Sequence, residues 1–157
     1  MPDEALDPGF FDLAAWAETE AARLAGTPVT KTVRVDGVTE ERRLAEVDWA
    51  QELAPFAQSS IDRPALWDAY AADSSRAGGL TTLRYRALDS SLFTREVVVE
   101  LDAARRVRVV RIDNRFDSYV ADTRQRLRYG PRGYAVYSRQ DARLMEPREL
   151  EIEVNWE

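Results

Sequence analysis

The side chains of this chain that could perform catalysis are carboxylates, hydroxyls and a single lysine, because the sequence has no histidine and no cysteine. Ser-His-Asp and Cys-His arrangements, and most transition-metal sites, need those missing residues. A serine–lysine pair would have to use Lys31, which stands among polar residues in a predicted strand, where a solvated ammonium is a poor base. We therefore expect a protein that is not an enzyme and that uses no cofactor.

Paired carboxylates are the remaining route to hydrolysis, since cleavage of a glycosidic bond needs only an acid and a base or nucleophile. The candidates are Asp62, Asp68 and Asp73, which lie in the least regular part of the chain. Aspartate is also a common residue of turns and helix caps, and the spacing of these three does not indicate a catalytic pair. A carboxylate-only hydrolase remains the alternative function.

Oxygen ligands for a hard cation such as calcium occur close together in the second half of the chain. They are Asp113, Asn114, Asp117 and Asp122. The spacing of an EF-hand, with its glycine and terminal glutamate, is absent. Gly78-Gly79 likewise lacks the lysine and the serine or threonine of a phosphate-binding loop. We predict no metal site.

Arginines supply the positive charge of the predicted outward strand positions. They could line a stripe that holds an anionic lipid headgroup or an acidic partner, or they could pair across strands with glutamates, which is the favoured interpretation. The arginines are Arg84, Arg86, Arg106, Arg108, Arg124, Arg126 and Arg128, and the glutamates are Glu96, Glu100, Glu149, Glu151 and Glu153.

Aromatic residues are the remaining resource for binding. Trp16, Trp49 and Trp156 fall on predicted apolar faces and are expected in the core. The predicted rim of a cleft between helices and sheet consists of Trp67, Tyr70, Tyr119 and Tyr134. Packing in the core is the alternative for these four residues.

Length and composition fit one globular domain. The chain has 157 residues, of which 45% are hydrophobic and 32% charged. Its apolar runs are far shorter than the roughly 20 residues that a membrane helix needs. The formal net charge of -6 argues against nucleic acid as a partner, because phosphate binding needs a basic surface.

The first half of the chain predicts helices and one hairpin. A flexible tail over 1–7 ends at Asp7, which can cap an amphipathic helix that runs from Pro8 to Gly26. Asp36-Gly37 between two β-prone runs is a strong signal for a type I′ hairpin. Asp48 can cap a short second helix, residues 66–70 suggest a turn of helix or an irregular packed segment, and residues 74–79 have the composition of a loop.

From residue 80 onward the sequence alternates between apolar and polar positions, with short polar connections. This pattern predicts six antiparallel strands in a meander, because neighbours in sequence are then neighbours in space. The expected strands are 80–88, 92–101, 105–115, 119–129, 134–145 and 148–156. In the third strand the apolar phase slips between Val109 and Val110, which suggests a β-bulge or burial of both faces.

These elements predict a single α+β domain over residues 1–157: an N-terminal helix, a β-hairpin and a short helix, followed by a curved antiparallel meander of about six strands. Residues 8–79 would form the helical and hairpin cover, and residues 80–156 would form the sheet. The hairpin would stand at the edge of the sheet or apart from it.

Several short motifs resemble a family of uncharacterised small outer-membrane lipoproteins of Bacteroidetes. The motifs are Phe10-Phe11-Asp12-Leu13, Lys31-Thr32-Val33 with Gly37 and Glu41, Asp48-Trp49-Ala50-Gln51-Glu52-Leu53, Asp62, Pro64, Tyr70, Tyr85, Arg126-Leu127-Arg128-Tyr129 and Gly133-Tyr134. The resemblance implies export, removal of a signal, and lipid attachment at a cysteine upstream of Met1. It implies no activity and no site residues.

We therefore expect a non-enzymatic, envelope-associated binding or interaction domain of unknown ligand. The more specific hypothesis is a carrier of an apolar ligand or of a lipoprotein. A purely structural module is a further alternative. The expected partners are a lipid or an envelope protein. The expected location is the periplasmic side of the outer membrane if the resemblance holds, and the cytoplasm otherwise, because the first residues do not resemble an export signal.

Overall fold

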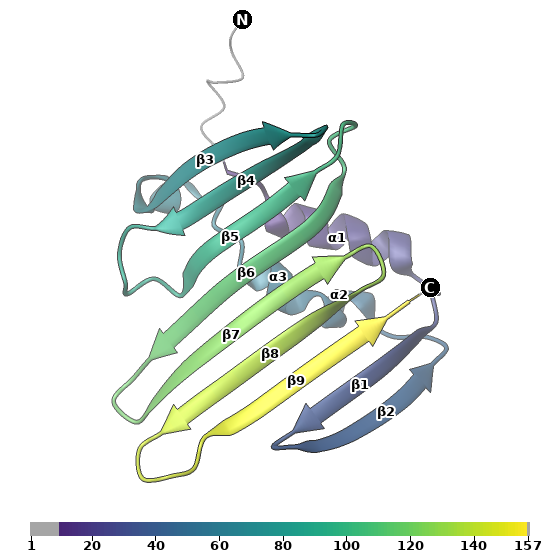
Figure 1. Ribbon diagram of the computed structural model, residues 1–157, viewed down its shortest axis with the longest axis vertical. Coiled ribbons are helices and arrows are strands. Elements are labelled where there is room, and N and C mark those ends of the chain that lie inside the picture. The colour runs from purple at the N-terminus through teal and green to yellow at the C-terminus, as the bar shows by residue number, and fades with distance from the viewer. Residues whose placement is uncertain (1–9, 157) are drawn as a thin grey trace, which may run out of the picture.

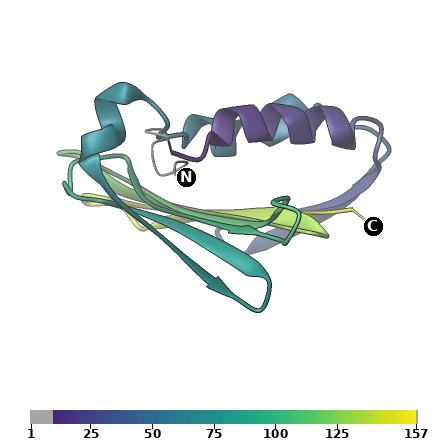
Figure 2. The same ribbon diagram turned by 90° about the horizontal axis from the view of Figure 1, so that it is seen from above.

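Nine antiparallel strands form one sheet in the computed structural model, which describes residues 10–156. All the helices of this part of the chain lie against one face of the sheet and leave the other face bare (Figures 1 and 2). The helices are α1 (Leu13–Leu24), α2 (Trp49–Glu52), α3 (Ala54–Gln58) and the 3-10 helix η2 (Pro64–Ala69). The strands are β1 (Val29–Val35), β2 (Val38–Leu44), β3 (Tyr70–Ala77), β4 (Leu80–Ala87), β5 (Thr94–Leu101), β6 (Val107–Asp117), β7 (Ala121–Gly130), β8 (Gly133–Ala142) and β9 (Arg148–Asn155).

The strand order across the sheet is β2-β1-β9-β8-β7-β6-β5-β4-β3. The chain forms the β1–β2 hairpin at one edge, crosses behind the sheet through the short helices, and returns as a meander from β3 at the opposite edge. The last strand, β9, then pairs with β1, with Val33 opposite Ile152. The predicted α+β class and the six-strand meander are confirmed, and the hairpin is the edge of the sheet.

The hairpin turn has the geometry that its sequence predicts. Asp36 and Gly37 both have positive φ values, 49° and 89°. A type I′ turn needs this conformation at both central residues, and Asp-Gly tolerates it better than most pairs. The turn sets the register in which Val35 faces Val38.

Residues 70–77 form strand β3, so the prediction of a loop over 74–79 is wrong for residues 74–77. The turn of helix predicted over 66–70 is present as η2, which ends at Ala69. Strand β3 contains mostly alanine and serine, which have little preference for strands. It is an edge strand that pairs only with β4, from Tyr70 opposite Ala87 to Ala77 opposite Leu80. Backbone hydrogen bonds therefore hold it, with little contribution from side-chain packing. Residues 10–79 thus supply three strands as well as the covering helices.

Helix α1 begins at Leu13, and the Asp12 side chain caps it by accepting a hydrogen bond from the Ala15 N–H at 3.0 Å. The predicted cap Asp7, the start at Pro8 and the tail over 1–7 lie outside the described residues. The helix ends at Leu24, and Gly26 follows in the left-handed region at φ 82°. Leu13, Ala17 and Leu24 form its buried face.

The expected bulge is present in β6. Glu100 lies opposite Val109 and Leu101 lies opposite Val107, so Arg108 is an extra residue on its strand. The apolar phase shifts here from one strand face to the other, because an extra residue reverses the direction of every side chain beyond it.

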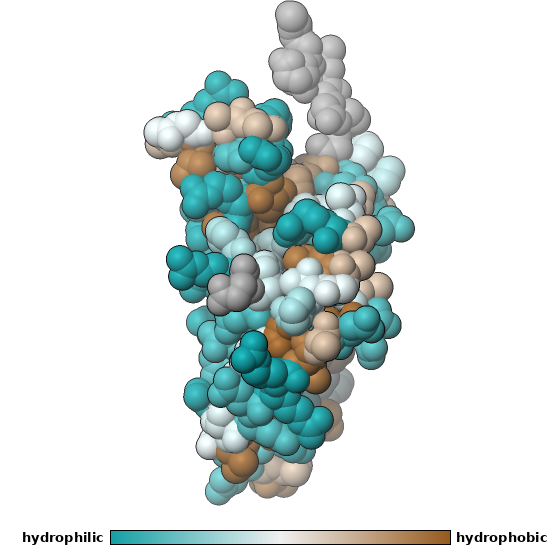
Figure 3. Space-filling view, turned by 90° about the vertical axis from the view of Figure 1, so that its right-hand side faces the viewer, coloured by the Kyte–Doolittle hydropathy of each residue, from teal (hydrophilic) through white to brown (hydrophobic). Residues whose placement is uncertain are grey.

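The core lies between the sheet and the helices, where a side view shows apolar atoms between hydrophilic outer surfaces (Figure 3). Phe56 of α3 is fully buried, and its ring lies 6.0 Å from Trp16, 6.0 Å from Tyr129 and 5.8 Å from Tyr134. Trp49 and Trp156 are buried as predicted and pack edge to face at 5.6 Å. Trp16 is only half-buried, and its outer side borders the groove described next.

Candidate functional site

An open groove of about 780 Å³ runs beside α1. One wall is the outer side of α1, and the other is the turn between β5 and β6. The turn between β7 and β8, with Gly130 and Pro131, borders the groove as well. Its volume falls within the roughly 300–1,000 Å³ typical of small-molecule sites.

The floor of the groove is apolar and aromatic. Trp16 packs edge to face on Tyr129 with ring centroids 4.7 Å apart, and Val107 and Ala15 extend the apolar surface. Trp16 reaches this place because it stands three residues after Leu13 on the helix, beside the buried stripe. A ligand with an apolar body could contact this floor without displacing core side chains.

Two of the carboxylates in the groove are occupied by the fold itself. Asp12 caps α1, as described above. Asp102 accepts hydrogen bonds from the backbone N–H groups of Ala104 and Arg106, both at 2.9 Å, and these bonds stabilise the β5–β6 turn. The hydrogen bond from the backbone N–H of Arg106 makes the largest contribution and lowers the pKa of Asp102, although burial acts in the opposite direction.

The third carboxylate, Glu20, links α1 to the sheet. Arg23 contacts it at 2.8 Å, and the hydroxyl of Tyr129 on β7 donates a hydrogen bond to it. Burial works against the charge on Glu20, but the bonds from Arg23 and Tyr129 outweigh it and lower the pKa of Glu20. Burial and the bond to Glu20 raise the pKa of Tyr129 well above its ordinary value. Glu20 therefore belongs to the contact between helix α1 and the sheet.

The arginines of the groove are less fully paired than its carboxylates. Arg106 lies 3.5 Å from Asp102, whereas Arg105 and Arg108 have no ion pair among the described residues. Arg105 has a φ of 64°, because it occupies the left-handed position of the tight β5–β6 turn. The groove thus combines an apolar floor with free positive charge on one wall.

A second link between a tyrosine and a glutamate lies deeper under the helices. Tyr134 of β8 stands directly opposite Tyr129 in the sheet, and its hydroxyl donates a hydrogen bond to Glu52 of α2. Lys31 lies 3.0 Å from the same carboxylate. Burial and the bond to Glu52 raise the pKa of Tyr134. This arrangement fastens α2 to the sheet, and it gives the only lysine of the chain a structural role.

The structure does not bring the four predicted rim residues to one cleft, and the groove contains none of them. Tyr134 is buried under α2. Tyr70 is buried and donates a hydrogen bond to the Thr94 carbonyl at 2.6 Å, and Trp67 lies in the same region, where its indole N–H donates to Asp62 at 3.2 Å. Tyr119 is 92% exposed in the β6–β7 turn.

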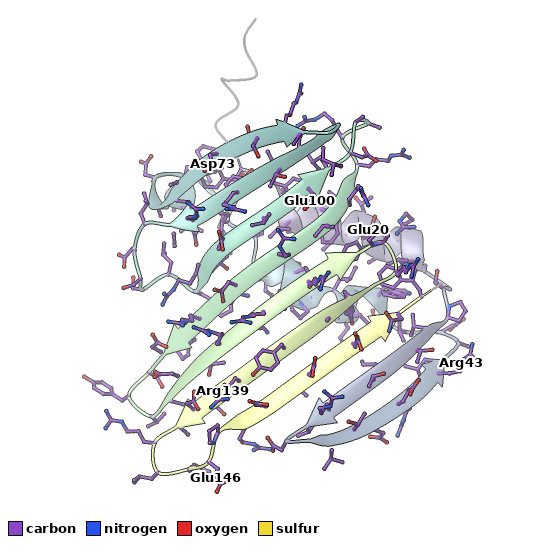
Figure 4. The ribbon with its side chains drawn as sticks, viewed as in Figure 1. Glu20, Arg43, Asp73, Glu100, Arg139 and Glu146 are labelled. Carbon is purple, nitrogen blue, oxygen red and sulfur yellow. The ribbon has the colours of Figure 1, made fainter. Side chains whose placement is uncertain are left out.

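The three candidate catalytic aspartates do not form one site. Asp62 accepts hydrogen bonds from the Phe10 N–H at 2.8 Å and from Trp67, so its carboxylate ties the segment before α1 to η2. Asp68 is exposed on η2. Asp73 is exposed on edge strand β3, and Figure 4 labels it there.

The four oxygen-bearing residues considered for calcium do not share one site. Asp113 and Asn114 are consecutive in β6, so they point to opposite faces of the sheet. Asn114 is fully buried and donates hydrogen bonds to Ser59 and Gln125, both at 2.9 Å. Within residues 10–156, no group of three or more acidic side chains is placed to hold a metal ion.

The predicted arginines divide between two surfaces. Arg106 and Arg108 border the groove, while the other five lie on the open face of the sheet. Arg84 and Arg86 lie 3.7 and 3.4 Å from Glu96, as the ion-pair interpretation predicts. Arg124, Arg126 and Arg128 have no ion pair in the described part of the chain.

Little in the sequence predicts the groove. The sequence predicts Trp16 in the core, because the residue falls on a predicted apolar face. The one available signal was the run Arg105-Arg106-Val107-Arg108, which places positive charge beside an apolar strand position directly after a tight turn.

No family model, no curated protein and no solved structure matches this chain. Among the described residues, no helix is both long enough and apolar enough to cross a membrane.

Proposed function

We propose that this protein is a non-enzymatic binding domain whose groove beside α1 holds a ligand with an apolar body and an anionic group. The observation that carries this proposal is the unequal use of charge in the groove. Asp12, Glu20 and Asp102 are bound within the protein, whereas Arg105 and Arg108 have no ion pair among the described residues.

The chemistry of the two walls favours a carboxylate- or phosphate-headed amphiphile of the lipid class. Its apolar chain would lie along α1 on Trp16 and Val107 and remove their exposed surface from water. Its anionic head would meet the guanidinium groups, which bind carboxylates and phosphates with two parallel hydrogen bonds. Neither contact alone would give selectivity, because a neutral chain lacks the head and a small anion lacks the chain.

The proposal includes the envelope-associated setting that the resemblance to the Bacteroidetes lipoproteins implies. In that setting lipids and lipoproteins are the natural cargo of such a groove. A non-enzymatic role agrees with the structural use of the carboxylates, since Asp62 and Glu20 are engaged in fastening elements together.

Titration with decanoate, decanol and acetate tests the proposal, with amide and indole NMR shifts as the readout. We expect decanoate to shift Trp16 and Val107 signals with an affinity at least tenfold higher than decanol, and acetate to produce no shift. Two matched substitutions on α1 locate the site. Ala15 lines the groove and Ala14 does not, although both are exposed in the first turn of the helix.

Ala15→Glu should weaken decanoate binding by at least tenfold, because the new carboxylate repels the anionic head and fills the groove. Ala14→Glu should bind as the parent protein does. Both glutamates lie in the first helical turn, where negative charge is favourable, so both variants should fold. Equal affinities of the two variants, or no binding of decanoate to the parent, would contradict the proposal.

A further inference from the structure

The face of the sheet that the helices leave bare carries charged side chains in cross-strand rows. Figure 4 looks onto this face, with Arg139 and Glu100 labelled on it and Glu20 labelled on α1 behind the sheet. One row, from β6 to β1, contains Asp113, Arg126, Tyr137, Glu151 and Arg34. The next row contains Arg111, Arg128, Ala135, Glu153 and Thr32.

In both rows, the residues on the two sides of β8 carry charges of opposite sign. The β7 neighbour of β8 is an arginine and the β9 neighbour is a glutamate. In the first row the reversal continues one strand further out, with Asp113 on β6 and Arg34 on β1. A surface that is antisymmetric in charge about a line is complementary to a copy of itself turned by 180° about that line.

Such a rotation about an axis along β8 brings the bare faces of two chains together. The rotation places β7 of one copy over β9 of the other, and β6 over β1. Each row of one copy then faces the same row of the other copy. Arg126 of one copy then faces Glu151 of the other, and Arg128 faces Glu153. Because the contact is twofold, each of these pairs forms twice.

Within one chain, several of these charged side chains have no partner of opposite charge among the described residues. Arg126, Arg128 and Glu153 have no ion pair among residues 10–156. Arg111 stands directly opposite Arg128, and its nearest carboxylate is Glu100 at 3.9 Å. Like charges placed directly across a strand pair repel each other. A second copy would place carboxylates over the unpaired arginines and relieve this repulsion.

We propose that a second copy of this chain packs on the bare face to form a twofold, face-to-face dimer with β8 at the axis. The uncharged Ala135 and Tyr137 would meet their counterparts at the centre. Arg139, further along β8, also approaches its counterpart, but Glu149 at 2.8 Å and Asp141 at 3.3 Å already balance its charge.

The dimensions of the face suit such a contact. Facing sheets stand about 10 Å apart, a gap that extended arginine and glutamate side chains can bridge. Five strands of about eight residues cover roughly 650 Å² in projection, which approaches the roughly 800 Å² per partner of a standard interface. The helices would lie on the two outer sides of the dimer, so the groove beside α1 would stay open in each copy.

Sedimentation velocity with two charge-reversed variants tests the proposal. Arg126→Glu/Arg128→Glu makes both flanks of β8 acidic, and Glu151→Arg/Glu153→Arg makes both basic. We expect the parent chain to dimerise at low salt, each variant alone to be monomeric, and their equimolar mixture to form a heterodimer. Raising the salt from about 0.05 to about 0.5 M should weaken the parent dimer by about tenfold, because the contacts are screened.

The exchange Glu40→Arg/Arg42→Glu on the edge strand β2 is the control, because this exposed pair lies outside the contact. It should leave the dimer unchanged. A monomeric parent at every concentration and salt, or two folded variants that fail to associate when mixed, would overturn the proposal.

Chemical cross-linking covers the case in which a charge-reversed variant fails to fold. The chain has no cysteine, so Tyr137→Cys introduces a single thiol near the proposed axis. A bismaleimide of about 10 Å, the separation of facing sheets, should link this variant into a dimer. Ser75→Cys on the exposed edge strand β3 should stay monomeric under the same conditions. Equal cross-linking at both positions, or none at residue 137, contradicts the face-to-face dimer.

Discussion

The same strands build two faces of opposite character, because successive side chains point to opposite sides of the sheet. On the covered face, Leu127 and Tyr129 of β7 are buried against the helices. On the bare face of that strand, Arg126 and Arg128 are exposed. One side of the strand therefore holds the domain together, and the other side is free to contact another molecule.

The polar groups of the two faces differ in the same way. On the covered face, Tyr129 and Tyr134 each donate a hydrogen bond to a glutamate from a helix, and each glutamate is also bound by a cation. On the bare face, the β7 arginines are left unpaired among the described residues. A fully paired polar group fixes the position of an element, whereas an unpaired exposed charge is available for recognition.

Truncation of Phe56, the largest fully buried side chain among the described residues, should give the largest difference between buried and exposed positions. Phe56→Ala removes a ring that contacts Trp16, Tyr129 and Tyr134, and we expect the free energy of unfolding to fall by about 3–5 kcal/mol. Phe116→Ala is the control, since that ring is 59% exposed, and it should lower the value by less than about 1 kcal/mol. Urea unfolding followed by circular dichroism measures both, and similar losses would contradict the proposed core.

Gly133, on the bare face of the sheet, leaves no room for a side chain. A Cβ on Gly133 would lie 2.1 Å from the backbone carbonyl oxygen of Val154, whereas a Cβ on its cross-strand partner Gly130 would meet nothing within 4 Å. We expect Gly133→Ala to lower the free energy of unfolding by about 1–3 kcal/mol, because the backbone of β9 would have to move. Gly130→Ala is the matched control. Equal effects in urea unfolding would show that β8 and β9 lie further apart than described.

Removal of the hydroxyls of Tyr129 and Tyr134 should change how the stability of the covered face depends on pH. The folded protein raises the pKa of Tyr129 and Tyr134 above the ordinary value of 10.0. Above about pH 10 the unfolded chain therefore releases protons that the folded protein retains, so stability is complete below that pH and falls as pH rises further. The protein should become progressively easier to unfold in alkali.

The variant Tyr129→Phe/Tyr134→Phe should lose about 1–2 kcal/mol per hydroxyl at pH 7, because Glu20 and Glu52 lose a donor. It should also show a flatter decline in stability between about pH 10 and 11, since the two shifted groups are gone. Tyr119→Phe, at a side chain 92% exposed, should change neither quantity. Urea midpoints measured from pH 7 to 11 give the comparison, and an equally steep decline in all three proteins contradicts the role of the hydroxyls.

Local patterns were sufficient to predict much of the fold. The alternation in 80–156 predicted strands β4 to β9 to within a few residues, and Asp36-Gly37 predicted the hairpin. Strand β3 was missed because its alanines and serines carry no strand signal, and its pairing depends on the backbone of β4. The contact between β1 and β9 joins segments more than a hundred residues apart, so a local pattern could not reveal it.

The candidate site could be predicted much less well for the same reason. Glu20 and Tyr129 are 109 residues apart, and each looks ordinary in its own segment, one as a helix-surface glutamate and the other as a buried strand tyrosine. None of the four aromatic residues of the predicted rim lines the groove. Three of them pack or form hydrogen bonds within the fold, which is the usual fate of large aromatic side chains.

Substitution of an arginine on the bare face should have the smallest effect on the free energy of unfolding and a large effect on formation of the proposed dimer. Arg128→Ala removes an exposed side chain without an ion pair in the described residues, and it also removes the repulsion from Arg111 directly opposite. The free energy of unfolding should therefore change by less than about 0.5 kcal/mol. The same substitution should weaken the proposed dimer, because Glu153 of the second copy loses its counterion. Urea unfolding and sedimentation velocity on one sample separate the two quantities, and a loss of stability comparable to that of Phe56→Ala would mean that the bare face is part of the core.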